Sequence, residues 1–116
     1  MDFHHLAMPS TAACAALRQR RSRLRARVDA LRAEPDREFV HAFTVLVAEV
    51  EAAFRHEESM LELLGDACLH PRRADHAVIL CALHRTVPRV ESGDLRLGRQ
   101  VADALDDVLA DSSSPF

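Results

Sequence analysis

Residues 54–80 read FRHEESMLELLGDACLHPRRADHAVIL, and this stretch decides the fold of the chain. Its first part carries apolar residues at helical spacing up to Leu61 and Leu64. Gly65 follows, and glycine commonly stands just past the end of a helix. Pro71 then suits the first turn of another helix. The stretch therefore predicts two helices joined by a short turn.

The residues outside this stretch predict one further helix on each side of the pair. Ser10 or Thr11 is a suitable N-cap for the first helix, and Asp36, which follows a proline, is a suitable N-cap for the second. Pro88 is expected to stop the third helix, and Asp94, after a Ser-Gly pair, to cap the fourth. The expected helices span residues 11–34, 36–64, 71–87 and 94–111, all within a single domain over residues 1–116.

Apolar residues recur at spacings of three and four in each expected helix, and they never alternate as in a strand. They are Leu17, Leu24, Val28 and Leu31; Phe43, Leu46, Val47, Val50, Phe54, Leu61 and Leu64; Ile79, Leu80, Leu83 and Val87; and Val101, Leu105, Val108 and Leu109. Four such helices with short connections favour an all-α fold, an antiparallel up-down four-helix bundle.

The composition agrees with a helical domain. Hydrophobic residues make up 48% of the 116 residues and there are only three glycines. No apolar stretch is long enough to span a membrane, and the first ten residues lack the pattern of a secretory signal. With three cysteines far apart, free thiols and a cytoplasmic location are the simplest expectation.

Charge is distributed unevenly along the chain. All fifteen basic residues are Arg, and eight of them lie between Arg18 and Arg37. The last expected helix carries several aspartates, so it should attract the first helix if the two are neighbours. An Arg-rich face for nucleic acid is the less favoured interpretation, because the net charge is −3 and core residues are interspersed.

Four polar residues interrupt the apolar stripes. Arg21 lies between Leu17 and Leu24, Glu57 lies in the middle of the second helix, and Arg72 and His76 lie one turn apart on the third. A buried charge requires a partner or a metal, because desolvation is costly. These residues therefore indicate one shared site.

The stretch quoted above, followed by VESGDL at residues 90–95, resembles the central region of the bacterial hemerythrin family. In that family one helix carries H-x-x-x-E, the next carries H-x-x-x-H, and a first-helix His and a last-helix H-x-x-x-x-D complete a di-iron site. The resemblance implies a hemerythrin-like bundle. It is clear from about Phe39 to Leu95 and fainter elsewhere.

The resemblance also places the family's ligand positions on this chain. Glu57 and His76 match two of them, whereas Arg21, Ala53 and Arg72 stand where the family has His. The last-helix His falls at Asp111 or Ser112, and the final Asp falls at Phe116 or beyond.

Arg has no lone pair to give a metal, and a di-iron site needs about five to seven donors. We therefore expect no metal cofactor, and expect Arg21, Arg72 or both to hold Glu57 instead. Replacing Glu57 by Ala should then destabilise the protein far more than replacing Glu58.

The leading functional expectation is a metal-poor hemerythrin-like module with an interaction, regulatory or remnant role, and not an enzyme. A protein partner is possible; its identity and the oligomeric state are not predicted. The alternative is a di-iron oxygen carrier or sensor that uses Glu57 and His76 with unusual ligands, His41 or His56.

Cysteine and histidine also suggest a zinc quartet of Cys68, His70, Cys81 and His84. An unbroken third helix would hold Cys68 and Cys81 too far apart for this, because ten residues of helix span ~15 Å.

Overall fold

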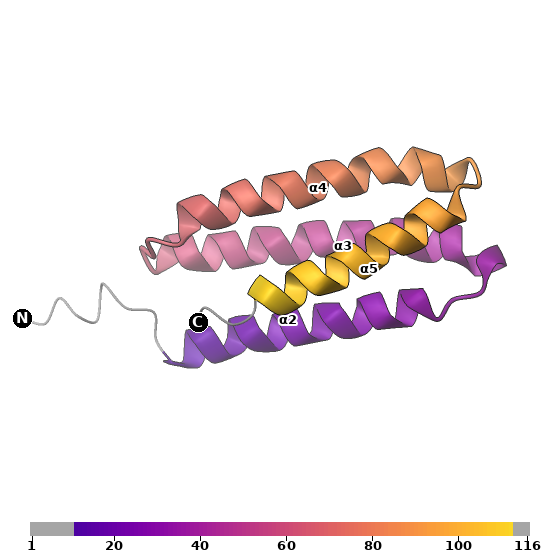
Figure 1. Cartoon of the computed structure of the whole chain (residues 1–116). Helices are drawn as coiled ribbons and strands as arrows, with labels where there is room; N and C mark the ends of the chain where they lie inside the picture. The colour runs from indigo at the N-terminus through magenta and orange to yellow at the C-terminus, as the bar shows by residue number, and fades with distance from the viewer. Residues whose placement is uncertain (1–10, 113–116) are drawn as a thin grey trace, which may run out of the picture.

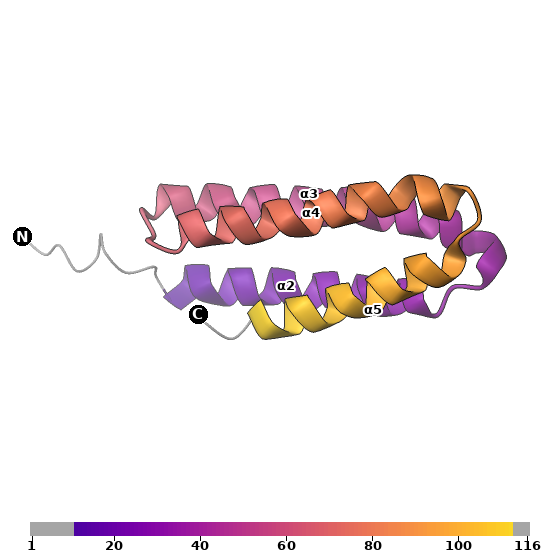
Figure 2. The same ribbon diagram turned by 45° about the horizontal axis from the view of Figure 1, so that its top comes forward.

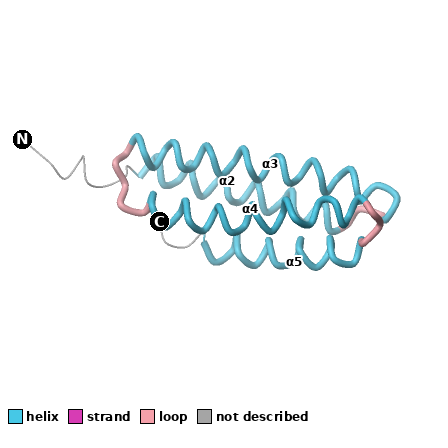
Figure 3. Tube along the Cα trace, turned by 90° about the horizontal axis from the view of Figure 1, so that it is seen from above, coloured by secondary structure: helices cyan, strands magenta, loops and turns pink. Residues whose placement is uncertain are grey.

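The computed structural model describes residues 11–112, and in this part of the chain it has four α-helices and no strand. The helices are α2 (Thr11–Arg32), α3 (Asp36–Leu63), α4 (Leu69–Glu91) and α5 (Leu95–Ser112). Figure 3 shows that the described chain is helical throughout, apart from short connections at the two ends. The all-helical expectation is therefore confirmed.

The helices lie side by side, in an arrangement compatible with a four-helix bundle. α2 packs against α3 and α5, and α4 packs against the same two helices. In Figure 1 the chain passes back and forth, with the α2–α3 and α4–α5 connections at one end and the α3–α4 connection at the other. Figure 2 shows the same order after rotation, with α3 beside α4. This arrangement brings one face of every helix to a common interior.

Two of the expected helix boundaries around α4 are wrong. The helix begins at Leu69, before Pro71, because the Asp66 side chain accepts a hydrogen bond from the backbone N–H of Cys68 at 2.8 Å and starts the turn early. Proline is tolerated there, since the first N–H groups of a helix have no partner within it.

Pro88 also fails to stop α4, which continues to Glu91. The missing proline N–H costs one helical hydrogen bond near the end of the helix. Val90, in the turn beyond, is fully buried, and its packing accounts for the helix continuing past the proline.

Glycine closes both helices of the central pair, at Gly65 as expected and at Gly93 in place of the stop expected at Pro88. Gly65 has a φ of +63°, and Asp66 N–H donates to Leu61 C=O while Gly65 N–H donates to Glu62 C=O. This is the Schellman arrangement, which requires a left-handed residue after the helix. Gly93, with a φ of +105°, closes α4 in the same way.

The expected N-caps have mixed outcomes. The Asp94 side chain accepts a hydrogen bond from the Leu97 N–H at 3.2 Å, so it caps α5 as expected. Asp36 instead occupies the first turn of α3, with Pro35 in the cap position and no side-chain cap bond. An acidic first-turn residue still interacts favourably with the helix dipole. Of the expected α2 caps, Ser10 and the Thr11 side chain lie outside the described residues.

Most of the expected apolar residues form the core. All of those expected on α2 are buried, as are all on α3 except Leu64, which is half-buried. Val108 was expected in the core but is 40% exposed, because it lies on the side of α5 that faces a pocket described below. Phe39, Val90 and Ala102 join the core in addition.

The close packing of α5 against α3 and α4 depends on Gly98. Gly98 is buried, and a Cβ atom there would lie 2.6 Å from Cε2 of Phe39 and 2.8 Å from Cγ2 of Val90. A residue without a side chain therefore lets α5 pack directly on the Phe39 ring.

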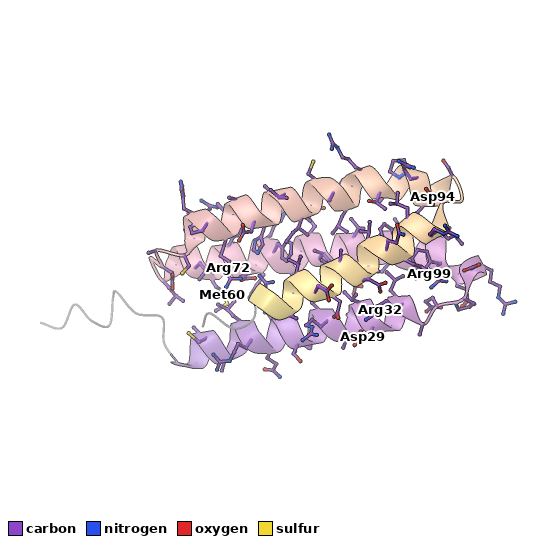
Figure 4. The ribbon with its side chains drawn as sticks, viewed as in Figure 1. Asp29, Arg32, Met60, Arg72, Asp94 and Arg99 are labelled. Carbon is purple, nitrogen blue, oxygen red and sulfur yellow. The ribbon has the colours of Figure 1, made fainter. Side chains whose placement is uncertain are left out.

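The charged faces of α2 and α5 meet as expected. Arg32 Nε lies 2.8 Å from Asp103 Oδ1, and Arg25 Nε lies 3.2 Å from Asp106 Oδ1. Arg32 and Asp29 are visible along α2 in Figure 4. Because these arginines pair with aspartates of the neighbouring helix, less positive charge is left on the surface to bind nucleic acid. No helix in the described part of the chain is long and apolar enough to cross a membrane.

Candidate functional site

The four polar residues that interrupt the apolar stripes are all buried. Arg21 on α2, Glu57 on α3, and Arg72 and His76 on α4 are each at most 7% exposed. They come together because each takes a core-facing position in its helix, and the three helices pack around the same interior. Figure 4 shows Arg72 reaching inward from α4.

Glu57 is held between two guanidinium groups, as expected from the sequence. Nη2 of Arg21 donates to both Glu57 oxygens, at 2.9 and 3.1 Å. Nη1 of Arg72 lies 3.3 Å from Glu57 Oε1. The predicted pairing of Glu57 with Arg21 and Arg72 is therefore confirmed. The attraction between these buried charges is stronger than in a surface pair, and it offsets the cost of removing each of them from water.

His76 links this pair to a second carboxylate. Its Nε2 lies 3.3 Å from Arg21 Nη2, and its Nδ1 lies 2.6 Å from Oε2 of Glu58. Because a guanidinium has only donors, Nε2 must accept, and the imidazole proton must then reside on Nδ1 and be donated to Glu58. The contacts therefore define a neutral His76 in its Nδ1–H tautomer.

The electrostatics favour the same neutral state. Burial lowers the pKa of His76 below its ordinary value of 6.5, and the Arg21 charge lowers it further. The hydrogen bond to Glu58 and the charges of Glu57 and Glu58 oppose this, but burial is the largest cause. His76 therefore has no charge near neutral pH.

An aromatic ring holds the imidazole in place. Phe54, one turn before Glu57, stacks on His76 with the ring centroids 3.8 Å apart and the planes 6° from parallel. Arg21 Cζ lies 5.5 Å from the centre of the same ring. The stack fixes the imidazole plane, so that its two nitrogens point at Arg21 and Glu58.

Glu58 belongs to the site, which sequence reasoning missed. It was expected only as the neighbour of Glu57 with little effect on stability, yet it binds His76, and its Oε1 lies 3.5 Å from Arg73 Nε. Both ring nitrogens of a buried histidine need a hydrogen-bond partner. This requirement was the one signal in the sequence that indicated a second acidic residue near His76. Glu58 thus has His76 and Arg73 as partners, whereas Arg21 and Arg72 hold Glu57.

Ala53 also faces this cluster. It lines a cavity of about 10 Å³ together with Arg21, Phe54 and Glu57. A larger residue at position 53 would project toward the same point. Five of the positions given by the resemblance, 21, 53, 57, 72 and 76, therefore lie around one centre. The last-helix positions, Asp111 or Ser112 and Phe116, have side chains outside the described residues.

The donor set does not fit a di-iron centre. Both oxygens of Glu57 accept from guanidinium groups, and both nitrogens of His76 are engaged by Arg21 and Glu58. Two Arg side chains also bring positive charge to where a metal ion would lie. Among the side chains that the structure describes, at residues 12–110, no group of three or more His, Cys, Asp or Glu is placed to hold a metal ion.

The residues of the alternative ligand set are not brought together. His41 and His56 are exposed on α3, whereas Glu57 and His76 are buried. His41 precedes Glu57 by sixteen residues of the same helix, or ~24 Å. The structure therefore joins only Glu57 and His76 of that set.

The zinc quartet that the sequence argued against is not assembled either. α4 is unbroken from Leu69 to Glu91, so Cys68, just before its start, is held far from Cys81. Both thiols are free and exposed, and His84 lies 3.4 Å from Oε1 of Glu51 instead. The sequence argument against zinc agrees with this placement.

Comparison with protein-family models, with curated proteins and with solved structures found no match for this chain. Its functional interpretation therefore rests on its own residues.

The lowered pKa of His76 predicts a pH-dependent stability. The unfolded state binds a proton near pH 6.5, whereas the folded state does so only at lower pH. Between these two pKa values the unfolded state holds more protons, so the free energy of unfolding should fall as the pH is lowered through this window. One proton changes it by at most ~1.4 kcal/mol per pH unit.

Urea unfolding between pH 5.5 and 7.5 would measure this slope. The variant His76→Gln should lose this contribution, and the exposed-site variant His56→Gln should keep it. An unchanged slope in His76→Gln would show that another group is responsible.

Proposed function

We propose that this chain is a hemerythrin-like, antiparallel up-down bundle in which a cluster of buried charges replaces the metal centre. In this proposal the protein is cytoplasmic, binds no metal cofactor, and acts as an interaction or regulatory module, or persists as a structural remnant. The single observation that carries the proposal is the burial of Glu57 between Arg21 and Arg72.

The arrangement of the cluster supports the idea of charge replacement. The resemblance assigns His to positions 21 and 72, and in this chain two guanidinium cations meet a single carboxylate there. Two cationic side chains can neutralise carboxylates that would otherwise bind metal cations, and they leave a bundle interior with balanced charge. The fold then remains stable without iron.

A non-catalytic role follows from the same contacts. The lone pair on His76 Nε2 accepts from the Arg21 guanidinium, and the proton on Nδ1 is donated to Glu58. A general base or metal ligand needs that lone pair available. The proposal therefore assigns these residues to stability and to the shape of the bundle surface.

Metal analysis tests the proposal. Protein expressed in iron-supplemented medium should be colourless and contain well under one iron per chain, because Arg occupies two ligand positions and Ala a third.

Two irons per chain with oxo-bridge absorption would contradict the proposal and favour an oxygen carrier or sensor. If any metal is found, the variant His76→Ala distinguishes the two cases. Loss of that metal would place it in the cluster and also contradict the proposal, whereas retention would place it elsewhere on the chain.

A further inference from the structure

The outer side of α4 is apolar although it is exposed to solvent. Residues 77–83 read AVILCAL, so the helix is apolar on every side over about two turns. Four of these residues are exposed: Ala77, Val78, Cys81 and Ala82. Val78 has the largest of these side chains and is 71% exposed. A helix that is apolar all round is normally buried on all sides, so this stretch indicates that another molecule covers it.

No other helix of the described chain covers this side. α4 packs against α3 and α5, and its remaining side faces outward. In Figure 1 it runs along the upper edge of the bundle. The apolar surface is therefore accessible to a partner along the length of the helix.

The same surface extends toward α5. Val108 is 40% exposed, and with Val78 and half-buried Ile79 it lines a pocket of about 210 Å³ between α4 and α5. The cluster residues at the inner end of this pocket are at most 7% exposed. The pocket therefore presents mainly its apolar wall to solvent.

Two charged residues flank the apolar stretch. Asp75 and Arg85 are both exposed, and neither forms an ion pair with another side chain in the described part of the protein. The other arginines nearby on α4 differ, because Arg73 pairs with a glutamate of α3 and Arg89 pairs with Asp94. Asp75 and Arg85 are thus available to a partner.

The charges and the apolar residues share one face of the helix. The residues that form it follow one another at spacings of three, four and three: Asp75, Val78, Ala82 and Arg85. We call these four residues the outer face of α4. It has a negative end, an apolar middle and a positive end.

This order makes the outer face complementary to itself. In an antiparallel pair of α4 helices related by a twofold axis at the level of Leu80, Asp75 of each copy lies opposite Arg85 of the other. Val78 then lies opposite Ala82, so a larger side chain meets a smaller one and the helices can pack closely. A twofold interface uses the same patch on both copies, so each of these contacts occurs twice.

We propose that a second copy of this chain covers the outer face of α4, in an antiparallel dimer that pairs Asp75 with Arg85. Burial of the apolar middle drives association, and the two ion pairs fix the direction and register of the helices. The hydrocarbon stem of each Arg85 packs beside the pocket that Asp75 and Val78 line. This inference depends on the surface of α4 alone, and therefore goes beyond the proposed function.

Sedimentation equilibrium of the full-length protein measures the association. We expect a monomer–dimer equilibrium at about 10–500 µM, because one pair of helices makes a small interface. Asp75→Arg places Arg opposite Arg, and Arg85→Asp places Asp opposite Asp. Each change should weaken dimerisation at least ~10-fold, while circular dichroism shows that the helices remain.

A mixture of the two single variants is the sharpest comparison. One variant then carries Arg at both positions and the other carries Asp at both, so every pair in a mixed dimer has opposite charges. We expect the equimolar mixture to dimerise although neither variant does so alone. The double variant Asp75→Arg, Arg85→Asp should dimerise within about threefold of the unmodified protein, because both pairs are restored in reverse.

Matched charge reversals away from α4 serve as controls. Glu38→Arg and Arg23→Asp make the same changes in net charge as the two test variants. Glu38 is exposed in the first turn of α3, and Arg23 is exposed on α2. Each control should leave the dimerisation constant within about twofold, since a distant exposed charge is screened.

Loss of the dimer in each single variant and its return in the mixture supports the proposal. A protein that stays monomeric throughout the concentration range would overturn it, as would a dimer that persists in both single variants. Equal weakening by the controls, or a mixture of folded single variants that stays monomeric, would overturn it too. None of these results depends on the iron content, so the proposal can fail while the proposed function stands.

Discussion

Replacing Glu57 by Ala is expected to lower the free energy of unfolding by about 3–5 kcal/mol, the typical cost of breaking a buried ion pair. Glu57 is 4% exposed and is the carboxylate between the guanidiniums of Arg21 and Arg72. Its removal leaves two like charges facing each other in a poorly solvated interior. The loss should therefore exceed that from a single surface pair many times over.

Glu62→Ala is the appropriate control for this experiment. Glu62 lies on the same helix, its side chain is 67% exposed, and its nearest ionic contact is Arg73 at 3.8 Å. Its removal should cost about 0–1 kcal/mol. Glu58 is unsuitable as a control because it binds His76. Equal, small effects of Glu57→Ala and Glu62→Ala in urea unfolding would mean that the cluster contributes little to stability.

Converting the whole charged triad to apolar residues should restore most of that loss. In the variant Arg21→Met, Glu57→Leu, Arg72→Met, no member of the triad retains a charge that needs a counter-ion. Replacing a buried ionic group by apolar residues of similar volume is often neutral or stabilising by about 1–4 kcal/mol. The triple variant should therefore unfold at a urea concentration near that of the unmodified protein.

The intermediate double variant is a sharper comparison. The double variant Arg21→Met, Glu57→Leu keeps Arg72 but removes the Glu57 carboxylate, whose Oε1 lies 3.3 Å from Arg72 Nη1. We expect this double variant to be less stable than the triple variant, even though it carries fewer changes. Additive losses across the three substitutions would contradict the idea that the three residues act as one unit.

The location of the cluster could be predicted because its members break a pattern. Arg21, Glu57 and His76 stand at core-facing positions of helices whose neighbouring turns are apolar, and periodicity alone identifies such positions. Desolvation then requires them to find partners, and the pairing with Glu57 follows. The helix end at Gly65 was similarly visible, since it needs a left-handed residue.

Other features depended on contacts between helices that no local pattern records. The stacking of Phe54 on His76 requires the rotation of α3 against α4, and the hydrogen bond from His76 to Glu58 requires the register between those helices. Continuation of α4 past Pro88 reflects the burial of Val90, a tertiary effect that overrides a strong local preference. The pocket beside Val108 likewise depends on where α5 ends.

The tautomer of His76 is the most direct test of the cluster itself. Nitrogen NMR on protein labelled at its histidine side chains distinguishes a protonated ring nitrogen from one with a lone pair. Assignment by comparison with His76→Gln isolates this residue from the other six histidines. At neutral pH we predict a neutral ring with the proton on Nδ1 and the lone pair on Nε2 directed at Arg21. A proton on Nε2, or a doubly protonated ring, would contradict the arrangement in which Arg21 binds both Glu57 and His76.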